Sequence, residues 1–500
     1  MNRRHFVRTS LAAAVAISFH RELALAAMAD GGAAVSGDIK AVRADGQEVI
    51  LKQSAVQELA DSLRGNVVLP GSEAYENARL LLNPRINKYP ALVVQPVVPN
   101  DVCNAVKFAR QENLLTAVKC GGHNFRGDSS CDGGMQIDLS RLRGVRVDAA
   151  RRTAWASGGS LLGDLDAEAM ARGLVTTAGS VSHTGVGGLT LGGGFGRLAR
   201  RFGLSIDNLL SVDIVTADGE LRHASADENP DLFWAVRGGG GNFGVVTAFE
   251  FQMHPMDRQV ISGSYGFPFE QARQVFEFAG EFAAEAPDVL QVVPFIGAFP
   301  GTDPVCNLSI VYCGPHDKAE GLLAPIEKAG TVVRNSVQTW DYVALQKSGD
   351  IDDPRANGAY IKSGFVKQIT SDIARDLTDT FQPSPARATW MAFGHSGGAI
   401  GRVPYGATAF PNRDAGHDLL SFIGWPIKSG DGSEHIAYVQ EQWKVLGPYT
   451  NGFYVNDIAN ETQAQVDANY GANLERLVQV KNQYDPTNLF RLNANVRPTV

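Results

Sequence analysis

A short strand that runs directly into a glycine-rich loop is the first feature that could do chemistry. Residues 115–119 have the composition of a strand, and Cys120-Gly-Gly-His123 follows at once. A polar segment, residues 124–129, continues the loop. Successive backbone N–H groups in such a loop can form an anion-binding concavity that suits a pyrophosphate. Taken alone, His123 would be interpreted as an ordinary hydrogen-bonded loop histidine.

A second glycine cluster, residues 178–196, is much longer than the first. It contains eight glycines, whereas a tight turn requires only about two or three. Because glycine has no Cβ atom, its backbone can approach a ligand closely. The cluster therefore predicts a stretch of backbone that follows a flat or charged ligand over many residues.

Two segments formally match the dinucleotide-binding fingerprint, residues 239–244 as GxGxxG and residues 194–199 as its GxGxxA form. The fingerprint requires a strand before it and a helix after it. A strand-like segment, residues 245–253, follows the first match, and the second match lies inside the glycine cluster. The sequence also lacks the P-loop pattern GxxxxGK[ST]. These observations exclude a Rossmann-type NAD site and a P-loop.

Composition excludes several other classes of protein. The net charge is −8 and no basic block is present, which argues against a nucleic-acid partner. No apolar run reaches the ~18–20 residues that span a bilayer. The five cysteines show neither CxxC nor Cys/His metal-ligand spacing, so we expect no metal site. We expect mostly free thiols, with at most one or two disulfides.

The pattern of elements predicts an α+β protein in which strand length and glycine content change near residue 257. Before it, short strands and helices surround the glycine clusters; after it, helices alternate with longer strands and glycine becomes rarer. We therefore place a domain boundary near residue 257.

The N-terminus has the pattern of an export signal. Arg3 and Arg4 precede the apolar run of residues 11–17, and an alanine-rich stretch follows. A charged start, a short apolar run and small residues define a signal peptide, which we place at residues 1–29. Paired arginines indicate the twin-arginine route, although an ordinary secretory signal is the alternative. We therefore expect a periplasmic or secreted protein.

Many further segments match, in order, those of one known family. They are Arg64–Gly71, Tyr89–Val94, Gly121–Asn124, the long glycine cluster, Arg201–Leu204, Asp207–Leu210, Val215–Gly219, Leu232–Gly244, Tyr454–Asn456, Lys481–Phe490 and Asn493–Asn495. On these segments the chain resembles the berberine-bridge-enzyme-like branch of the vanillyl-alcohol-oxidase/PCMH flavoproteins.

The resemblance implies a PCMH-type FAD-binding domain of two α+β subdomains over residues 50–257. It implies a substrate domain, residues 258–449, with an antiparallel sheet flanked by helices and covering the flavin ring. The C-terminal segment, residues 450–500, would return to the FAD domain. The substrate would lie between the sheet and the flavin.

The resemblance also assigns the cofactor contacts. It implies that the imidazole of His123 is bonded to the 8α-methyl carbon of the flavin. Many relatives add a second bond through a cysteine, but Val181 stands at that position, so we expect a single histidyl link. His183 is expected to line the site or to pack beside it. The other expected FAD-binding residues are Lys119, Cys120, Gly121, Gly122, Asn124, Gly127, Ser129, Gly179, Val181, Thr184, Gly185, Gly187, Gly188, Gly192, Gly244, Val245, Asn456, Asn493 and Asn495.

The chemistry that follows is hydride transfer from a small organic substrate to the flavin. We expect dioxygen to reoxidise the flavin and release hydrogen peroxide. Thr184 is polar where relatives often have an aliphatic residue that governs oxygen access. A dehydrogenase that uses another electron acceptor therefore remains an alternative, as does a non-catalytic flavoprotein that binds a small ligand.

The catalytic base is less clearly indicated. Tyr454 is the first candidate, because relatives often use a tyrosine in this segment, whereas Phe195 replaces a second tyrosine. Ser421 is the polar residue expected to face the substrate, and His395 and His417 are weaker candidates for the pocket wall. The sequence leaves open whether the substrate is an alcohol, a sugar, an amine or a secondary metabolite. It also leaves the oligomeric state open.

Overall fold

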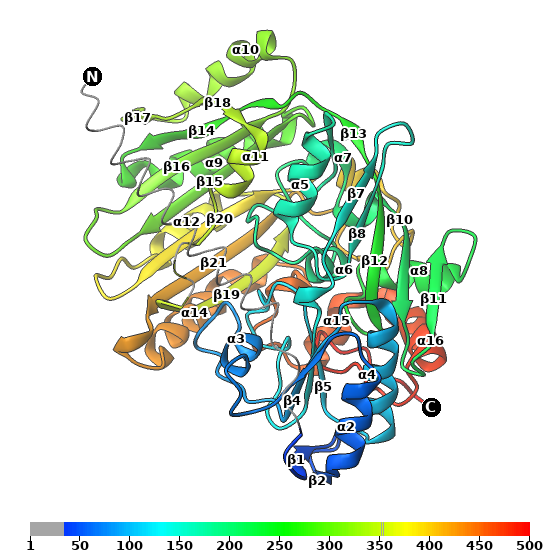
Figure 1. Cartoon of the computed structure of the whole chain (residues 1–500). Coiled ribbons are helices and arrows are strands. Elements are labelled where there is room, and N and C mark those ends of the chain that lie inside the picture. The colour runs from blue at the N-terminus through cyan, green and yellow to red at the C-terminus, as the bar shows by residue number, and fades with distance from the viewer. Residues whose placement is uncertain (1–34, 352, 354) are drawn as a thin grey trace, which may run out of the picture.

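The structure is a computed structural model that describes residues 35–351, 353 and 355–500. The predicted signal peptide lies outside these residues. Helices and strands are both abundant. Most strands belong to three main sheets, and helices pack around these sheets (Figure 1). The expected α+β class is confirmed. No helix among the described residues is long and apolar enough to cross a membrane.

The first sheet has four strands in the order β3-β4-β6-β5, in which β4–β6 and β6–β5 pair in parallel and β3–β4 antiparallel. The amphipathic helix α4 buries Val102, Ala105, Val106 and Ala109 beside it. The elements of this subdomain are β1 (Ile39–Val42), β2 (Glu48–Leu51), α2 (Gln53–Asp61), β3 (Asn66–Val68), α3 (Tyr75–Arg79), β4 (Leu92–Gln95), α4 (Pro99–Gln111), β5 (Thr116–Lys119) and β6 (Met135–Asp138).

The second sheet has five antiparallel strands in the order β11-β10-β12-β8-β7. Strands β9 and β13 form a separate two-stranded sheet. The elements of this part of the chain are β7 (Val145–Asp148), β8 (Thr153–Ser157), α5 (Leu162–Met170), β9 (Leu174–Val175), α6 (Val186–Leu191), α7 (Ala199–Phe202), β10 (Leu209–Val215), β11 (Leu221–Ser225), α8 (Pro230–Val236), β12 (Val245–Gln252) and β13 (His254–Pro255).

The C-terminal segment packs against this second sheet, as the red helices beside the green strands show (Figure 1). Tyr470 and Leu477 share one buried cluster with Phe249 of β12. The segment contains α15 (Gln463–Tyr470) and α16 (Leu474–Tyr484).

The third sheet has eight strands, with β17-β14-β16-β15-β20-β21-β19 in order and β18 beside β14. Helices α9, α12 and α14 cover one face. The elements are β14 (Gln259–Phe267), α9 (Ala272–Glu285), β15 (Leu290–Ala298), β16 (Val305–Tyr312), α10 (Ala319–Leu323), β17 (Arg334–Asn335), β18 (Gln338–Asp341), α11 (Tyr342–Lys347), β19 (Asn357–Val366), α12 (Ser371–Thr380), β20 (Ala388–His395), α13 (Ala399–Arg402), β21 (His417–Pro426) and α14 (Ser433–Leu446).

Alternation along β21 gives the eight-stranded sheet two different faces. Leu419 and Ile423 are buried in clusters that include residues of the covering helices. Successive side chains of a strand point to opposite faces. Asp418, Leu420 and Phe422 therefore project from the other face, which we call the open face.

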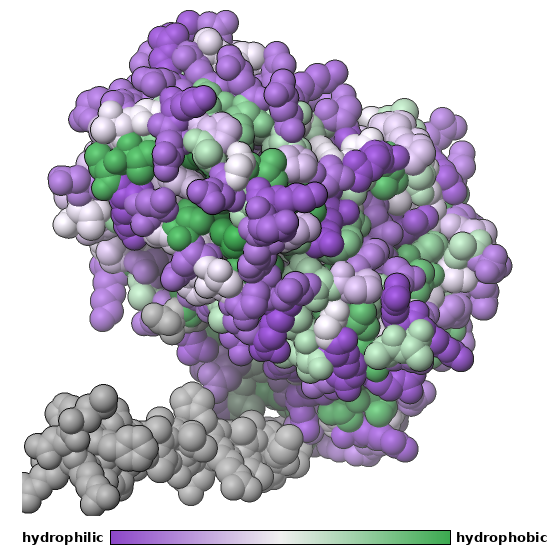
Figure 2. Space-filling view, turned by 90° about the horizontal axis from the view of Figure 1, so that it is seen from above, coloured by the Kyte–Doolittle hydropathy of each residue, from purple (hydrophilic) through white to green (hydrophobic). Residues whose placement is uncertain are grey.

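Seen from above, the surface is largely hydrophilic, with hydrophobic patches both on the left and toward the lower right of the view (Figure 2). All five cysteines are free, in agreement with the expectation of mostly free thiols.

Candidate functional site

A cavity of about 320 Å³ lies between the four-stranded and five-stranded sheets. Thr116 and Val118 of β5 line it, together with Val246 and Phe249 of β12. The loop after β5 and the C-terminal segment contribute further walls. This volume falls within the ~300–1,000 Å³ typical of ligand pockets.

The two glycine clusters meet backbone to backbone beside this cavity. A Cβ atom on Gly121 would lie 2.3 Å from the amide nitrogen of Gly185. A Cβ atom on Gly185 would lie 2.4 Å from Sγ of Cys120. Gly122 has a φ of +72°, which a residue with a Cβ atom rarely adopts. Glycine at these positions therefore serves the packing of the loops as well as access for a ligand.

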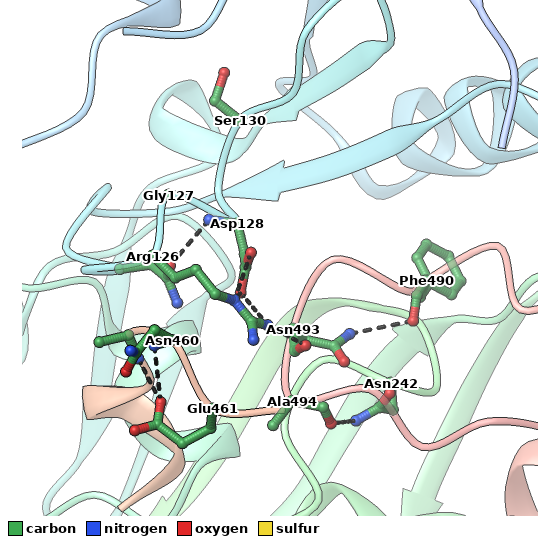
Figure 3. Close-up of polar contacts among 12 residues, drawn as sticks. Arg126, Gly127, Asp128, Ser130, Asn242, Asn460, Glu461, Phe490, Asn493 and Ala494 are labelled. Carbon is green, nitrogen blue, oxygen red and sulfur yellow. Dashed lines mark hydrogen bonds and ion pairs between the residues drawn. The ribbon is translucent and has the colours of Figure 1, made fainter. Parts of the chain in front are cut away.

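Polar contacts tie the loop after β5 to the C-terminal segment (Figure 3). Arg126 pairs with Asp128 and donates a hydrogen bond to the carbonyl oxygen of Asn493. The Asn493 amide in turn donates to the carbonyl oxygen of Phe490 at 3.1 Å. Asn242 donates to the carbonyl oxygen of Ala494 at 2.9 Å. These contacts close the cavity where the C-terminal segment returns.

The cavity has room and hydrogen-bonding capacity left for a cofactor. Gly188 and Gly241 both line it, and a Cβ atom on either would meet nothing within 4 Å. Oδ1 of Asn493 is buried without a partner. A buried acceptor without a partner costs free energy, so a ligand that donates a hydrogen bond there would stabilise the structure. The residues present fit a nucleotide cofactor such as FAD.

The structure brings most of the predicted FAD contacts together at the cavity wall. Gly127 packs against Ile86, and Gly179 against Leu162. Lys119 instead directs its ammonium group to the carbonyl oxygen of Ala78 and to Asp138. The predicted contacts found at the wall are Cys120, Gly121, Gly122, His123, Asn124, Ser129, Thr184, Gly185, Gly187, Gly188, Gly244, Val245, Asn456 and Asn493. Those not found there are Lys119, Gly127, Gly179, Val181, Gly192 and Asn495.

These exceptions have a common physical reason. Proximity in sequence to a ligand loop does not fix which way a residue points, and several of these residues support the loop from behind. Gly192 leaves space for the side chain of Asn456, which would lie 2.2 Å from a Cβ atom there. Val181 lies beside Gly349. The backbone oxygen of Asn495 accepts a hydrogen bond from Gln463.

His123 lines the cavity and is held by a second histidine. Its Nε2 atom lies 2.8 Å from Nδ1 of His183, and its Nδ1 atom lies 3.4 Å from the Thr184 hydroxyl. Burial, with a smaller contribution from His183, lowers the pKa of His123 to about 4. His123 is therefore neutral at physiological pH and has a nitrogen directed toward Thr184 and the cavity.

The tautomers of this pair follow from one backbone contact. The amide of Ile351 donates to Nε2 of His183 at 3.1 Å. A neutral imidazole that accepts at one nitrogen carries its proton on the other. A neutral His183 therefore donates from Nδ1 to Nε2 of His123. Asp350 accepts from the backbone and hydroxyl of Ser182 at 2.7 and 2.6 Å, so a loop of residues 258–449 holds the pair in place.

Tyr454 also lines the cavity, as the sequence predicted. Its phenolic oxygen accepts hydrogen bonds from the Gly194 amide at 2.9 Å and from Asn456 at 2.7 Å. Phe195 packs edge-on against it, with ring centroids 5.1 Å apart. Burial raises the pKa of Tyr454. Since a hydroxyl has two acceptor lone pairs and one proton, this neutral phenol can only donate further.

Ser421 does not reach the site, and that prediction needs correction. Its hydroxyl donates to Gln442 of α14 at 3.4 Å, so it points to the face covered by helices. The alternation of β21 places Asp418 on the open face instead. Because Leu419, Leu420, Phe422 and Ile423 are all apolar, the sequence of β21 shows no alternation that could have set this register.

His395 and His417 lie on the helix-covered face as well. His395 accepts a hydrogen bond from the amide of Val292 at 3.1 Å, and the two rings stack with centroids 5.4 Å apart. Burial lowers the pKa of His417 to about 4. Both are neutral packing residues and do not line the cavity.

Asp418 is a buried acid that sequence reasoning missed. Burial, and then the charge of Asp457, raise its pKa well above the usual value. Its Oδ1 atom is buried without a partner. Asp457 lines the cavity, and burial raises its pKa to about 7. Burial is the main cause for both acids, with Asp457 adding to the shift of Asp418 and Glu461 to that of Asp457, and buried acids with raised pKa values are typical of functional sites.

Comparisons with known proteins agree with this site. Residues 90–225 match the "FAD binding domain" family and residues 453–497 the "Berberine and berberine like" family. An FAD-linked oxidoreductase of Dictyostelium discoideum is 31% identical over 89% of this chain and 97% of its own length. (R)-6-hydroxynicotine oxidase of Paenarthrobacter nicotinovorans is 30% identical over 87% of this chain and 97% of its own.

A solved structure shows the same fold. 6-Hydroxy-D-nicotine oxidase from Arthrobacter nicotinovorans superposes with a TM-score of 0.79 at 29% identity, covering 87% of this chain and 98% of that one. The similarity spans both the cavity and the eight-stranded sheet. The chain is an FAD-linked oxidoreductase, and it belongs to the berberine-bridge-enzyme-like family of these enzymes.

Proposed function

We propose that this protein is an exported oxidase that holds FAD through a single covalent bond to His123. The observation that carries the proposal is the placement of His123 in the wall of a glycine-lined cavity whose remaining polar groups fit a nucleotide. The pKa of about 4 supports it, because a neutral imidazole, unlike an imidazolium, can act as a nucleophile toward carbon once it releases the proton that the contact with His183 places on Nδ1. The five cysteines provide no second attachment, since Val181 occupies the corresponding position in the glycine cluster.

Different residues around the cavity would bind the cofactor and orient the substrate. When bound, FAD supplies a hydride acceptor. The Asn493 side chain and the backbone of residues 120–129 would hold the cofactor. The Tyr454 phenol, which can only donate, would orient the oxygen or nitrogen of the substrate.

We assign the role of proton acceptor to Asp418 rather than to Tyr454. A catalytic base works best when its pKa lies near the working pH, and burial moves the Asp418 carboxyl in that direction. Its unpartnered Oδ1 atom is available to a substrate proton. Tyr454, with both lone pairs occupied, is a poor base in this arrangement.

Dioxygen is the proposed final acceptor, with hydrogen peroxide as the product. Thr184, which lines the cavity beside His123, is the feature that favours the alternative of a dehydrogenase with another acceptor. Reoxidation of the substrate-reduced flavin in air separates the two functions. A ligand-binding protein without activity would show no reduction at all.

Export by the twin-arginine route is a separate proposal that rests on Arg3 and Arg4. This route carries folded proteins, so FAD would be installed in the cytoplasm before export. Replacing both arginines with lysine should leave the flavinylated protein in the cytoplasm. Unchanged export would point to the ordinary secretory route.

The covalent bond is tested by acid precipitation of wild type and His123→Ala. We expect a yellow wild-type pellet and a colourless variant pellet. His254→Ala is a matched control, because His254 stacks on Phe202 and bonds to Asn208 away from the cavity wall. A colourless wild-type pellet would contradict the proposal.

A further inference from the structure

The end of α11 and the residues after it lie along the long glycine cluster. Successive residues of this segment contact successive residues of the cluster: Gln346 contacts Gly179, Gly349 contacts Ser180, Asp350 contacts Ser182 and Ile351 contacts His183. The Gln346 amide donates to the Gly179 carbonyl oxygen at 3.0 Å. A Cβ atom on Gly349 would lie 2.7 Å from the Ser180 carbonyl oxygen. We call residues 346–351 the clasp, because they fasten α11 to the cluster beside His123.

A buried acid holds the first residue of the clasp. Nε2 of Gln346 donates a hydrogen bond to Oδ2 of Asp166, on α5, at 3.1 Å. Only 1% of Gln346 and 3% of Asp166 are exposed. The other acids of α5, Asp164 and Glu168, are paired with arginines at the surface. Asp166 therefore places a titratable group inside the contact between α5 and α11.

Two further polar groups act on the charge of Asp166. Tyr342, on α11, is fully buried, and its hydroxyl has no partner among the residues that the structure describes. The guanidinium of Arg197 approaches from the chain that follows the glycine cluster. Burial raises the pKa of Asp166 to about 7, although the hydrogen bond from Gln346 and the charge of Arg197 lower it. The closed contact between α5 and α11 thus favours the neutral acid.

The neutral acid also completes the contact with Gln346. A protonated carboxyl donates one hydrogen bond and accepts others, whereas a carboxylate only accepts. Within the described part of the chain, Oε1 of Gln346 is buried without a partner, so it can accept the proton of neutral Asp166 while Nε2 donates back. Loss of that proton removes this second hydrogen bond and leaves a charge in a buried contact, which costs free energy. An apolar pair would hold α5 and α11 together equally at every pH.

The clasp links Asp166 to the attachment histidine. Gln346, which Asp166 anchors, and Ile351 belong to the same short segment. The amide of Ile351 donates to Nε2 of His183, whose Nδ1 atom lies 2.8 Å from Nε2 of His123. When Asp166 loses its proton, the segment that carries the Ile351 amide loses part of its buried anchor.

We propose that Asp166 is a positioning residue whose proton closes the clasp on the His183–His123 pair. Opening of the clasp hydrates Asp166 and returns its pKa toward the ordinary value of about 4. Between about pH 4 and pH 7, closing therefore takes up a proton, and the ratio of closed to open clasp falls by up to about tenfold per pH unit. Above this range the ratio is constant. The consequence for the cofactor rests on the proposed attachment of FAD to His123.

Hydrogen–deuterium exchange of the flavinylated protein tests the proposal. A peptide that spans residues 342–351 is compared in wild type and Asp166→Asn between pH 5 and pH 8, at equal pH so that the intrinsic exchange rate cancels. The asparagine can still accept from Gln346 and donate to it, but it cannot ionise. We expect exchange in wild type, relative to Asp166→Asn, to rise roughly ten- to fiftyfold from pH 5 to pH 7 and by less than about twofold from pH 7 to pH 8. Glu168→Gln, on the exposed side of α5, is the matched control and should follow wild type.

The outcomes separate the clasp from the attachment of FAD. A wild-type to Asp166→Asn ratio that stays the same at every pH would overturn the proposal. Gln346→Met is the second variant, in case Asp166→Asn does not fold. It removes both hydrogen bonds of the amide, so exchange should rise about fivefold or more at pH 5, and exchange equal to that of wild type would also overturn the proposal. A clasp that titrates in a protein whose acid-precipitated pellet is colourless would support the clasp and refute the attachment to His123.

Discussion

The wall of the FAD cavity and the open face of the eight-stranded sheet are built in different ways. The cavity wall comes largely from backbone: two glycine clusters that pack within contact distance of each other. The open face comes from side chains that alternate along the strands: the helix-covered positions are buried, and on the open side Leu420 and Phe422 are partly exposed whereas Asp418 is buried. The first arrangement tolerates almost no added atom, whereas the second can change its side chains without moving the backbone.

This difference suggests a division between a fixed cofactor site and an adjustable substrate site. Asp418, Leu420 and Phe422 can each be replaced while Leu419, Ser421 and Ile423 keep the sheet attached to its helices. Such a face can change its chemistry independently of the cavity wall. The predictions below test whether the two regions are separable.

Asp418→Asn should have the largest effect. The amide keeps the shape of the side chain but cannot accept the substrate proton, so kcat should fall by about 10²- to 10⁴-fold. Flavin content should stay unchanged, because Asp418 belongs to the open face. Ser421→Ala, on the opposite face of the same strand, should change kcat by less than about twofold. Equal activities of Asp418→Asn and wild type would remove Asp418 from the mechanism.

Gly121→Ala should affect the cofactor side instead. The added Cβ atom would lie 2.3 Å from the backbone of Gly185, and overpacking of this kind costs about 1–3 kcal/mol. We expect a lower unfolding free energy and less retained flavin. Gly321→Ala is the control, since a Cβ atom there meets nothing within 4 Å. A Gly121→Ala protein as stable and as yellow as the control would show that the clusters are less tightly packed than the structure indicates.

Sequence reasoning was effective for the cavity and poor for the open face. Local composition identifies His123 and the glycines, because the loop that lines the cavity is continuous in the chain. Local composition does not identify Asp418, since its role depends on whether the even or the odd positions of β21 face the helices. Ser421, the residue predicted from the same strand, points to the opposite, helix-covered face. The stack of Trp390 on Phe422 requires the pairing of β20 with β21, which no local pattern reveals.

Lys119 and Gly179 were both predicted to contact FAD, and both lie behind the cavity wall in the structure. Lys119 directly precedes Cys120, which lines the cavity, whereas the chain neighbours of Gly179 do not. Lys119 instead pairs with Asp138 at 3.4 Å, and Gly179 packs under Leu162 and Leu189. Sequence proximity located the loop but could not separate the residues that face the ligand from those that support it.

The pH dependence of stability tests the burial of Asp418. Its folded-state pKa is raised by burial and by Asp457, so between about pH 4 and that raised pKa the native protein keeps a proton that the unfolded chain loses; above the raised pKa Asp418 is ionised and can accept the substrate proton. The unfolding free energy of wild type should therefore fall relative to Asp418→Asn as pH rises, by up to about 1.4 kcal/mol per pH unit. Urea unfolding of both proteins between pH 4 and 8 measures the difference. A constant difference would mean that Asp418 titrates normally.

The smallest expected effect concerns the link between the two regions. His183 donates to Nε2 of His123 and is itself held by the amide of Ile351, in residues 258–449. His183→Ala removes one buried hydrogen bond worth about 1 kcal/mol, which corresponds to about fivefold in rate. We expect apoprotein mixed with FAD to form the covalent bond more slowly by that factor, because the His123 ring is no longer held with Nδ1 toward the cavity. His183→Asn, whose amide can still donate, should recover part of the rate. If both variants match wild type, His123 is positioned by its own loop, and the cofactor site is independent of the substrate domain even at this contact.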